Sequence, residues 1–292
     1  MTGIATDARL VTAAELAAPG DDRVIVDCRF NLASPGSGEQ AYRAGHIPGA
    51  WYAHLDRDLA GPPAPGSGRH PLPDPAALVA LFSRWGVGRT TLVVAADDAG
   101  GAIAARLWWL LRWMGHRRAA LLDGGIPAWV AQGLPLSTAP PSPGRGTFTG
   151  TPGQMPVLDA ADIAAGLRER SLLLLDARAR ARYLGEQEPI DPVAGHIPGA
   201  VNAPFQDSLA ADGRFRGRAV LRTMLAGRTA GAPRVAAMCG SGVTACHTIF
   251  ALEHAGLGTA SLYPGSWSGW IADPAHPVAR QEPGSLSPRD SG

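Results

Sequence analysis

One cysteine in this sequence stands where a side chain could act as a nucleophile. Cys239 follows the apolar run RVAAM, which has strand length, and precedes residues 243–255, whose apolar residues recur at helical spacing. We therefore expect a tight strand-to-helix turn, in which Gly240 and Gly242 let the backbone N–H groups curl inward. Such amides at a helix N-terminus favour negative charge and hence the reactive, anionic form of a thiol.

Two other interpretations of this loop compete with a sulfur nucleophile. Most unpaired cysteines are buried structural residues, although a core cysteine has no need of two flanking glycines. A cysteine phosphatase would carry an arginine six residues after the cysteine to clamp phosphate oxygens, and Ala245 occupies that position. The loop is therefore better suited to chemistry at sulfur than at phosphorus.

Composition restricts the class of protein. The chain has 292 residues, of which 46% are hydrophobic and 17% charged, enough for two ordinary domains. A net charge of +1 argues against a nucleic-acid or anionic-membrane partner, and the longest apolar stretch, residues 107–114, is too short to span a bilayer. Residues 1–10 show no signal-peptide pattern. Cys28, Cys239 and Cys246 cannot all pair and lack metal-binding spacing, which indicates a cytoplasmic setting and no metal.

The chain contains an internal sequence repeat. GHIPGA occurs at residues 45–50 and again at 195–200, and VDCR at 26–29 is echoed by LDAR at 175–178. The segment LLDGGIPAW likewise corresponds to LYPGSWSGW nearer the C-terminus. A duplicated supersecondary unit is the simplest explanation.

Within each copy, short apolar strands alternate with helices, which predicts an α/β fold with a parallel sheet flanked by helices. The expected strands are 24–27, 91–96, 119–122, 172–176, 234–238 and 260–263. A first short helix is expected to begin at Thr12, and another short helix is expected around Trp129. The other expected helices are 74–86, 101–114, 159–170, 220–225 and 243–255.

These patterns divide the chain into an N-terminal domain at 1–134, an exposed Pro/Gly/Ser-rich linker at 135–156, a catalytic domain at 157–273 and a tail at 274–292. In the first copy, Asp97 occupies the position of the cysteine. An aspartate cannot serve as the sulfur nucleophile, so we expect the first domain to be inactive and to form one wall of the cleft.

The repeated GHIPGA, the DCR and DAR strand ends, the DGG and GSWSGW segments and the Cys239 loop together resemble the tandem-domain rhodanese family of sulfurtransferases. The resemblance covers nearly the whole chain and implies two rhodanese-like domains, of which only the second is active. It implies a cysteine persulfide that passes sulfur to a thiol, cyanide or a thioredoxin-like protein, with no cofactor. We expect a monomer.

The residues after the cysteine bear on the sulfur donor. The CGSGVT sequence, which includes Val243 and Thr244, resembles that of 3-mercaptopyruvate sulfurtransferases, whereas thiosulfate enzymes carry two basic residues there. The resemblance makes Arg182 the candidate anchor for the donor carboxylate. A second arginine of that branch is missing, because Ile190 and Asp191 follow the Glu-Pro pair, so thiosulfate stays the alternative donor.

The resemblance also implies a proton relay of Ser241, His70 and Asp56, in which Asp58 competes for the role of Asp56. A neutral histidine beside a hydroxyl can move a proton near pH 7. Cys246 is expected to be a buried helix residue, with a resolving thiol as the alternative. A binding module that only stores a persulfide remains the non-enzymatic alternative.

Overall fold

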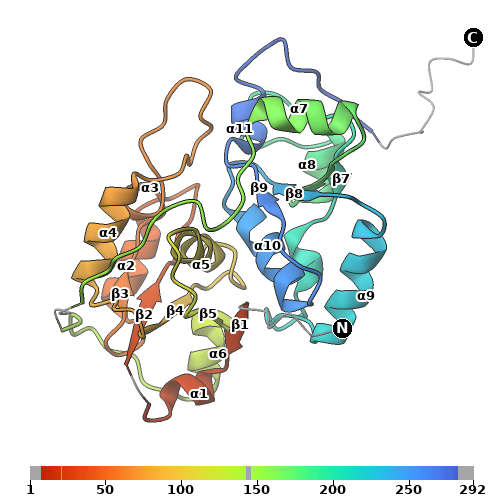
Figure 1. Cartoon of the computed structure of the whole chain (residues 1–292). Helices are drawn as coiled ribbons and strands as arrows, with labels where there is room; N and C mark the ends of the chain where they lie inside the picture. The colour runs from red at the N-terminus through yellow and green to blue at the C-terminus, as the bar shows by residue number, and fades with distance from the viewer. Residues whose placement is uncertain (1–7, 21, 143–145, 282–292) are drawn as a thin grey trace, which may run out of the picture.

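Two parallel sheets organise the molecule in the computed structural model, which describes residues 8–20, 22–142 and 146–281 (Figure 1). The first sheet has the order β1-β5-β4-β2-β3 and the second β7-β6-β8-β9. Their strands are β1 (Arg9–Val11), β2 (Arg23–Asp27), β3 (Trp51–Tyr52), β4 (Leu92–Ala96), β5 (Ala119–Leu122), β6 (Leu173–Asp176), β7 (Val201–Asn202), β8 (Val235–Met238) and β9 (Ser261–Leu262). The expected α/β fold is confirmed.

Helices connect the strands and cover the sheets, as right-handed parallel crossovers require. They are α1 (Ala13–Ala17), α2 (Ser37–Ala44), α3 (Leu55–Asp58), α4 (Pro75–Arg84), α5 (Ala104–Trp113), α6 (Gly125–Ala131), α7 (Ala160–Arg168), α8 (Arg180–Leu184), α9 (Arg218–Thr229), α10 (Thr244–His254) and α11 (Ser266–Trp270), with the 3₁₀ helix η1 at Phe205–Ser208. In the part of the chain that the structure describes, no helix has the length and apolar character needed to cross a bilayer.

Local sequence signals set several helix ends. Thr12 and Glu15 form the expected capping box, and the Asp74 side chain accepts from the N–H groups of residues 76 and 77 with Pro75 in the first turn. The short elements β1, β3, α2, α3, α8 and β7 did not emerge from the apolar pattern. They have too few residues for a periodicity to be recognised.

The repeat is visible in matching polar contacts. In the first copy, Arg29 bonds to the Asp27 carboxylate and donates to the carbonyl of Gly45 at 2.7 Å. In the second, Arg178 bonds to Asp176 and donates to the carbonyl of Gly195 at 2.8 Å. Each pair fastens a strand end to the start of a GHIPGA turn, which explains why both sequences recur together.

The histidines of the GHIPGA turns bond to the backbone and so shape the turns. The Nδ1 atom of His46 lies 2.8 Å from the carbonyl of Tyr42, and that of His196 lies 2.7 Å from the carbonyl of Tyr183. Each imidazole also stacks on the tyrosine ring of the same pair. These contacts close the loop after each short helix.

The segment 135–156 is less exposed than a free linker. Phe148 is buried and makes an edge contact with Phe82, and Met155 is also buried. The N–H of Gln154 donates to the carbonyl of Trp113. Parts of 146–156 are therefore packed against the first half, whereas most other described residues of 135–156 are exposed. In the tail, residues 274–281 follow α11, and the remainder lies outside the described residues.

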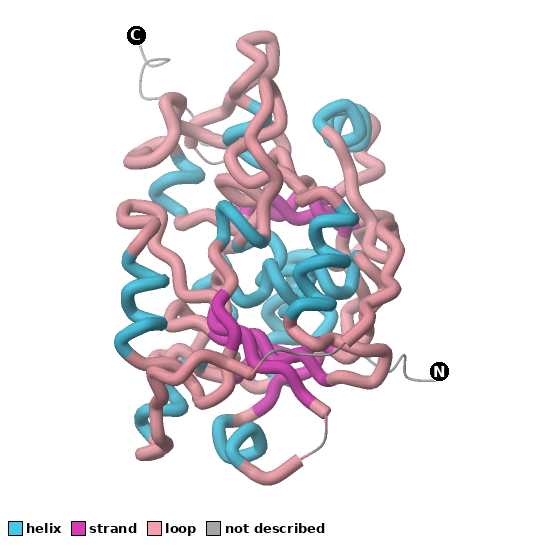
Figure 2. Tube along the Cα trace, turned by 90° about the vertical axis from the view of Figure 1, so that its left-hand side faces the viewer, coloured by secondary structure: helices cyan, strands magenta, loops and turns pink. Residues whose placement is uncertain are grey.

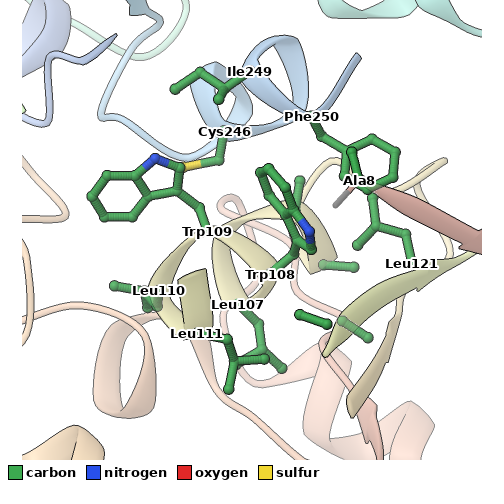
Figure 3. Close-up of a cluster of buried hydrophobic side chains, with 14 of the residues drawn as sticks. Ala8, Leu107, Trp108, Trp109, Leu110, Leu111, Leu121, Cys246, Ile249 and Phe250 are labelled. Carbon is green, nitrogen blue, oxygen red and sulfur yellow. The ribbon is translucent and has the colours of Figure 1, made fainter. Parts of the chain in front are cut away.

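Helices lie between the two groups of strands (Figure 2). One hydrophobic core extends across both halves of the chain. Helix α5 of the first half packs against α10 of the second, and the rings of Trp108 and Phe250 meet edge to face with centroids 5.0 Å apart. Both side chains are fully buried (Figure 3). The apolar faces of these two helices thus fix the position of each sheet relative to the other, and any site between the halves inherits that rigidity.

We expect Phe250→Ala to reduce the free energy of unfolding by about 3–5 kcal/mol, because it removes a buried ring and leaves a cavity between α5 and α10. Urea denaturation followed by circular dichroism measures the loss. Val220→Ala on the exposed face of α9 is the control, with an expected change below about 0.5 kcal/mol. Equal effects of the two substitutions would contradict a shared core.

Candidate active site

Cys239 directly follows β8, as expected, and is only 3% exposed. Its N–H donates to Ser266 Oγ at 3.1 Å, and its carbonyl accepts from the N–H of Trp267 at 3.0 Å. The carbonyl of Gly240 accepts from the N–H of Ser268 at 2.9 Å. The GSWSGW segment therefore holds the backbone of the cysteine loop through hydrogen bonds. It holds the backbone of Cys239 while the side chain lines a pocket.

The loop after Cys239 curls as the glycines suggested. Gly242 has φ of +78°, and a Cβ there would lie 2.8 Å from the carbonyl oxygen of Pro264, so only glycine fits. In the described part of the chain, the backbone N–H groups of residues 240–244 have no protein acceptor. They are the unpaired donors at the N-terminus of α10 and can receive an anion.

The corresponding loop of the first half shows what such a turn binds. Asp97 directly follows β4, and its carbonyl accepts from Ile126 as that of Cys239 accepts from Trp267. The Asp97 carboxylate accepts four backbone N–H bonds of 2.8–2.9 Å, from Ala99, Gly101, Ile103 and Ala104. The Asp97 carboxylate is thus surrounded by amides at this point of the fold, so a turn of this shape can hold an anionic group.

The structure brings together the three residues of the expected relay. His70 Nδ1 lies 2.7 Å from Ser241 Oγ, and His70 Nε2 lies 3.0 Å from Asp56 Oδ1. Asp58 instead accepts from the backbone N–H of His54 at 2.8 Å. The geometry therefore selects Asp56 over Asp58. It joins residues from the two halves, since His70 and Ser241 are 171 positions apart.

His70 is neutral at physiological pH. Burial lowers the pKa of His70 to about 4, and the positive charge of Arg106 acts in the same direction, against the opposing effect of Asp56. A carboxylate only accepts hydrogen bonds, so Nε2 carries the proton toward Asp56 and Nδ1 accepts from the Ser241 hydroxyl. In this tautomer His70 is ready to receive a proton through Ser241.

Arg106 on α5 was not recognised from the sequence as a site residue. Its guanidinium is fully buried and donates to the carbonyls of Leu59, His70, Pro71 and Gly242. It thereby connects the His70 loop of one half to the Cys239 loop of the other. The available signal was a charged residue inside an otherwise apolar, buried helix, because arginine is rarely buried without partners.

Two arginines border the nucleophile loop. Arg182 on α8 donates from Nε and Nη2 to Glu188, and from Nη2 to Asp191 at 3.0 Å. Arg69, from the first half, bonds to the other oxygen of Asp191. The sequence pattern had not indicated Arg69, whose acidic partner lies 122 positions away.

A pocket of about 180 Å³ opens over the sulfur. The Cys239 loop, Ser241 and Arg182 line it from the second half, with Arg69 and His70 from the first. Val243 and Thr244 also line this pocket. Gly242 does not line it, but its positive φ allows the turn to form. Phe30, Leu55 and Ile103 complete its apolar wall. The first half is therefore one side of the site.

The other two cysteines have no access to this pocket. Cys246 is fully buried in the cluster that also contains Trp109, and burial raises the pKa of its thiol to about 12 (Figure 3). Burial also raises the pKa of the Cys28 thiol well above its usual value. Cys246 is thus a structural residue, and its alternative role as a resolving thiol has no support in this geometry.

Comparison with known proteins agrees with this architecture. The family model described as "Rhodanese-like domain" matches residues 12–132 and 159–273, which is most of the chain in two segments. The chain belongs to the rhodanese family. The first matched segment contains all strands of the first sheet except β1, and the second contains the whole second sheet.

Curated relatives bear both of the expected donor names. A probable 3-mercaptopyruvate sulfurtransferase of Pseudomonas aeruginosa is 50% identical over 94% of this chain and 99% of its own length. A putative thiosulfate sulfurtransferase of Mycobacterium tuberculosis is 43% identical over 93% of this chain and 96% of that protein. The names of these relatives agree on sulfur transfer and differ in the donor.

Solved structures of family members share the fold of this chain. The 3-mercaptopyruvate sulfurtransferase of Leishmania major superposes with a TM-score of 0.79 at 30% identity, covering 89% of this chain and 73% of the other. The corresponding Escherichia coli enzyme gives a TM-score of 0.74 at 30% identity, covering 89% and 98%. The two-sheet arrangement is therefore that of the sulfurtransferases.

We expect the stability of the protein to fall as pH falls from about 6.5 toward 4. Burial lowers the pKa of both His70 and His247 to about 4, whereas the unfolded chain takes up these protons near pH 6.5. Acid therefore favours the unfolded state across that window. Urea midpoints at pH 7 and pH 5.5 measure the effect, and His70→Asn should reduce the difference between them. A midpoint that is unchanged or higher at pH 5.5 would refute this assignment.

Proposed function

We propose that this protein is a 3-mercaptopyruvate sulfurtransferase that carries sulfur as a persulfide on Cys239. The observation that supports this most strongly is the joint placement of three features at one pocket. A buried cysteine sits among unpaired loop amides, a serine–histidine–aspartate relay with a neutral histidine adjoins it, and Arg182 offers a guanidinium for a carboxylate. Each matches one chemical need of a keto-acid thiol donor.

In the first step, the Cys239 thiolate attacks the sulfur of the donor, and a new S–S bond forms. The donor C–S bond breaks, and its electron pair moves onto carbon to give the enolate of pyruvate. The loop amides of residues 240–244 stabilise the sulfur anion before attack, and Arg182 holds the donor carboxylate so that its sulfur points at Cys239.

The relay moves one proton during this step. The donor thiol releases its proton through the Ser241 hydroxyl to His70 Nδ1, and the imidazolium is stabilised by Asp56. The proton then returns through Ser241 to the enolate carbon, which yields pyruvate and leaves Cys239 as an anionic persulfide. The low pKa of His70 makes this imidazolium a strong acid and favours the return of the proton.

An acceptor completes the cycle. A thiolate or cyanide attacks the outer persulfide sulfur, the S–S bond breaks, and Cys239 leaves as the thiolate that began the reaction. No external oxidant or reductant is needed, because in the first step the donor carbon takes up the two electrons that the transferred sulfur gives up. The donor is a small molecule, and the acceptor is a thiol, cyanide or a thioredoxin-like protein.

The charges around the pocket favour mercaptopyruvate over thiosulfate. Arg69 and Arg182 are offset by Glu188 and Asp191, which bond to them. The site can therefore hold one additional negative charge more readily than two. Thiosulfate is the second candidate, because the Mycobacterium relative carries that name and a guanidinium can bind either anion.

We also propose the division into domains at 1–134 and 157–273, with 135–156 between them and a tail from 274. Each proposed domain contains one complete parallel sheet. A cytoplasmic location is proposed on the ground that Cys28, Cys239 and Cys246 are all free thiols.

Cys239→Ser should abolish sulfur transfer while the fold is kept. Mass spectrometry after incubation with 3-mercaptopyruvate should detect one additional sulfur atom on the peptide that contains Cys239 in the native protein, and none in the variant. Cys246→Ser is the matched control and should still acquire the sulfur. Multiple turnovers with cyanide distinguish the enzyme from a storage module, which would stop after one equivalent. Persulfide formation at another cysteine would disprove the proposal.

Arg182→Ala should lower kcat/KM for 3-mercaptopyruvate by roughly tenfold to a hundredfold, the effect of losing a charge-assisted hydrogen bond to a carboxylate. The loss with thiosulfate should be smaller, because thiosulfate has no carboxylate to anchor. Steady-state kinetics with both donors measure the ratio. Equal losses would remove Arg182 as the carboxylate anchor, and a native preference for thiosulfate would favour the second candidate.

A further inference from the structure

Arg69 approaches the nucleophile loop from the opposite half of the chain. A Cβ placed on Gly240 would lie 2.9 Å from Arg69 Nη2 and 3.6 Å from Arg182 Nη1. The two guanidiniums therefore converge on the backbone directly after Cys239. Glycine at position 240 leaves the space that both of them use.

Asp191 aligns the two arginines with each other. One carboxylate oxygen accepts from Arg69 Nη1 and the other from Arg182 Nη2. The Asp191 carboxylate is only 2% exposed, so it is a fixed point of the site. Because each guanidinium is planar, fixing one nitrogen on Asp191 determines where its remaining N–H groups point.

Donors remain on both arginines after these bonds are made. Among the described residues, Arg69 Nε is buried without an acceptor, and neither Arg69 Nη2 nor Arg182 Nη1 bonds to a protein group. The Nε and Nη2 atoms of Arg69 form one edge of its guanidinium, the arrangement that binds a carboxylate through both oxygens. Because Arg69 also lines the pocket, a carboxylate bound there could supply the acceptor that its free donors lack.

We propose that Arg69 is the second arm of a carboxylate clamp, so that Arg69 and Arg182 together bind the donor carboxylate across the two halves of the molecule. This inference rests on the proposed function and extends it. Residues 190 and 191 are Ile and Asp, so this segment provides no second arginine for the carboxylate. Arg69 takes that role. Its placement explains why Asp191 stands there, since that carboxylate aligns both arms.

A clamp of this kind also defines the donor class. It suits a small monocarboxylate whose sulfur lies a few bonds from the carboxylate, within a pocket of about 180 Å³. The apolar residues Phe30, Leu55 and Ile103 would then face the carbon skeleton. A donor without a carboxylate would use the arms only as general positive charge.

The test is Arg69→Gln, measured by the KM for 3-mercaptopyruvate and by the dissociation constant of pyruvate, which binds without turnover. Both should rise roughly tenfold to a hundredfold, with kcat less affected. Arg43→Gln, which breaks an exposed arginine–glutamate pair on α2, is the control and should change neither constant. Arg69→Lys should recover part of the affinity, since it keeps the charge and loses the bidentate edge.

Asp191→Asn separates a clamp from a mere ion pair. If Arg69 binds the donor, this variant should keep most of the affinity for pyruvate, because both arms retain their charge. If Arg69 served only to neutralise Asp191, adding Asp191→Asn to Arg69→Gln would restore the affinity for pyruvate, and the proposal would be overturned. Unchanged KM and pyruvate binding in Arg69→Gln would overturn it as well.

The double variant Arg69→Gln/Arg182→Gln gives a further check. Two arms on one carboxylate should lose less together than the product of their separate effects, whereas independent roles would multiply. Urea midpoints of all variants verify folding. A native protein that binds pyruvate but does not turn over 3-mercaptopyruvate would refute the proposed function and leave the clamp standing.

Discussion

The buried guanidinium of Arg106 is the contact on which the site depends. It donates to carbonyls of residues 59, 70, 71 and 242 and so joins the loop with the histidine to the loop with the cysteine. A charge placed in the interior is tolerated only where such dipoles surround it. Burial lowers the pKa of His70, and the charge of Arg106 acts in the same direction. One side chain thus holds the two loops together and also helps to keep His70 neutral.

The second constraint is the demand for negative charge at the end of the central strand of each half. In the first half, four backbone amides satisfy that demand with the carboxylate of Asp97. In the second half, the amides of residues 240–244 have no acceptor of their own, and Cys239 stands at the same point. The duplicated turn therefore holds an internal carboxylate in the first half, whereas in the second half its amides are left free for the anion that the proposed chemistry requires.

Much of the fold and of the site could be predicted from the sequence, and a definable part could not. Strand and helix periodicity, the capping residues and the GHIPGA repeat predicted the two parallel sheets, and the glycines around Cys239 predicted its turn. The relay of Ser241, His70 and Asp56 came only from the resemblance, because local patterns carry no information on contacts between residues so far apart. Arg69 and Arg106 were missed for the same reason. Arg106 donates to carbonyl groups, and Arg69 bonds to a carboxylate, all of them distant in the chain. Such contacts produce no recognisable spacing in the sequence.

The shared core of α5 and α10 makes the two copies dependent on each other. The first copy has Asp97 where the second has Cys239, and it contributes Arg69 and His70 to the pocket that the cysteine lines. The pocket therefore has a wall from each copy, and neither copy by itself contains the whole of it. Deleting either half would remove the proposed site as a whole, although the repeated sequence suggests two separable modules.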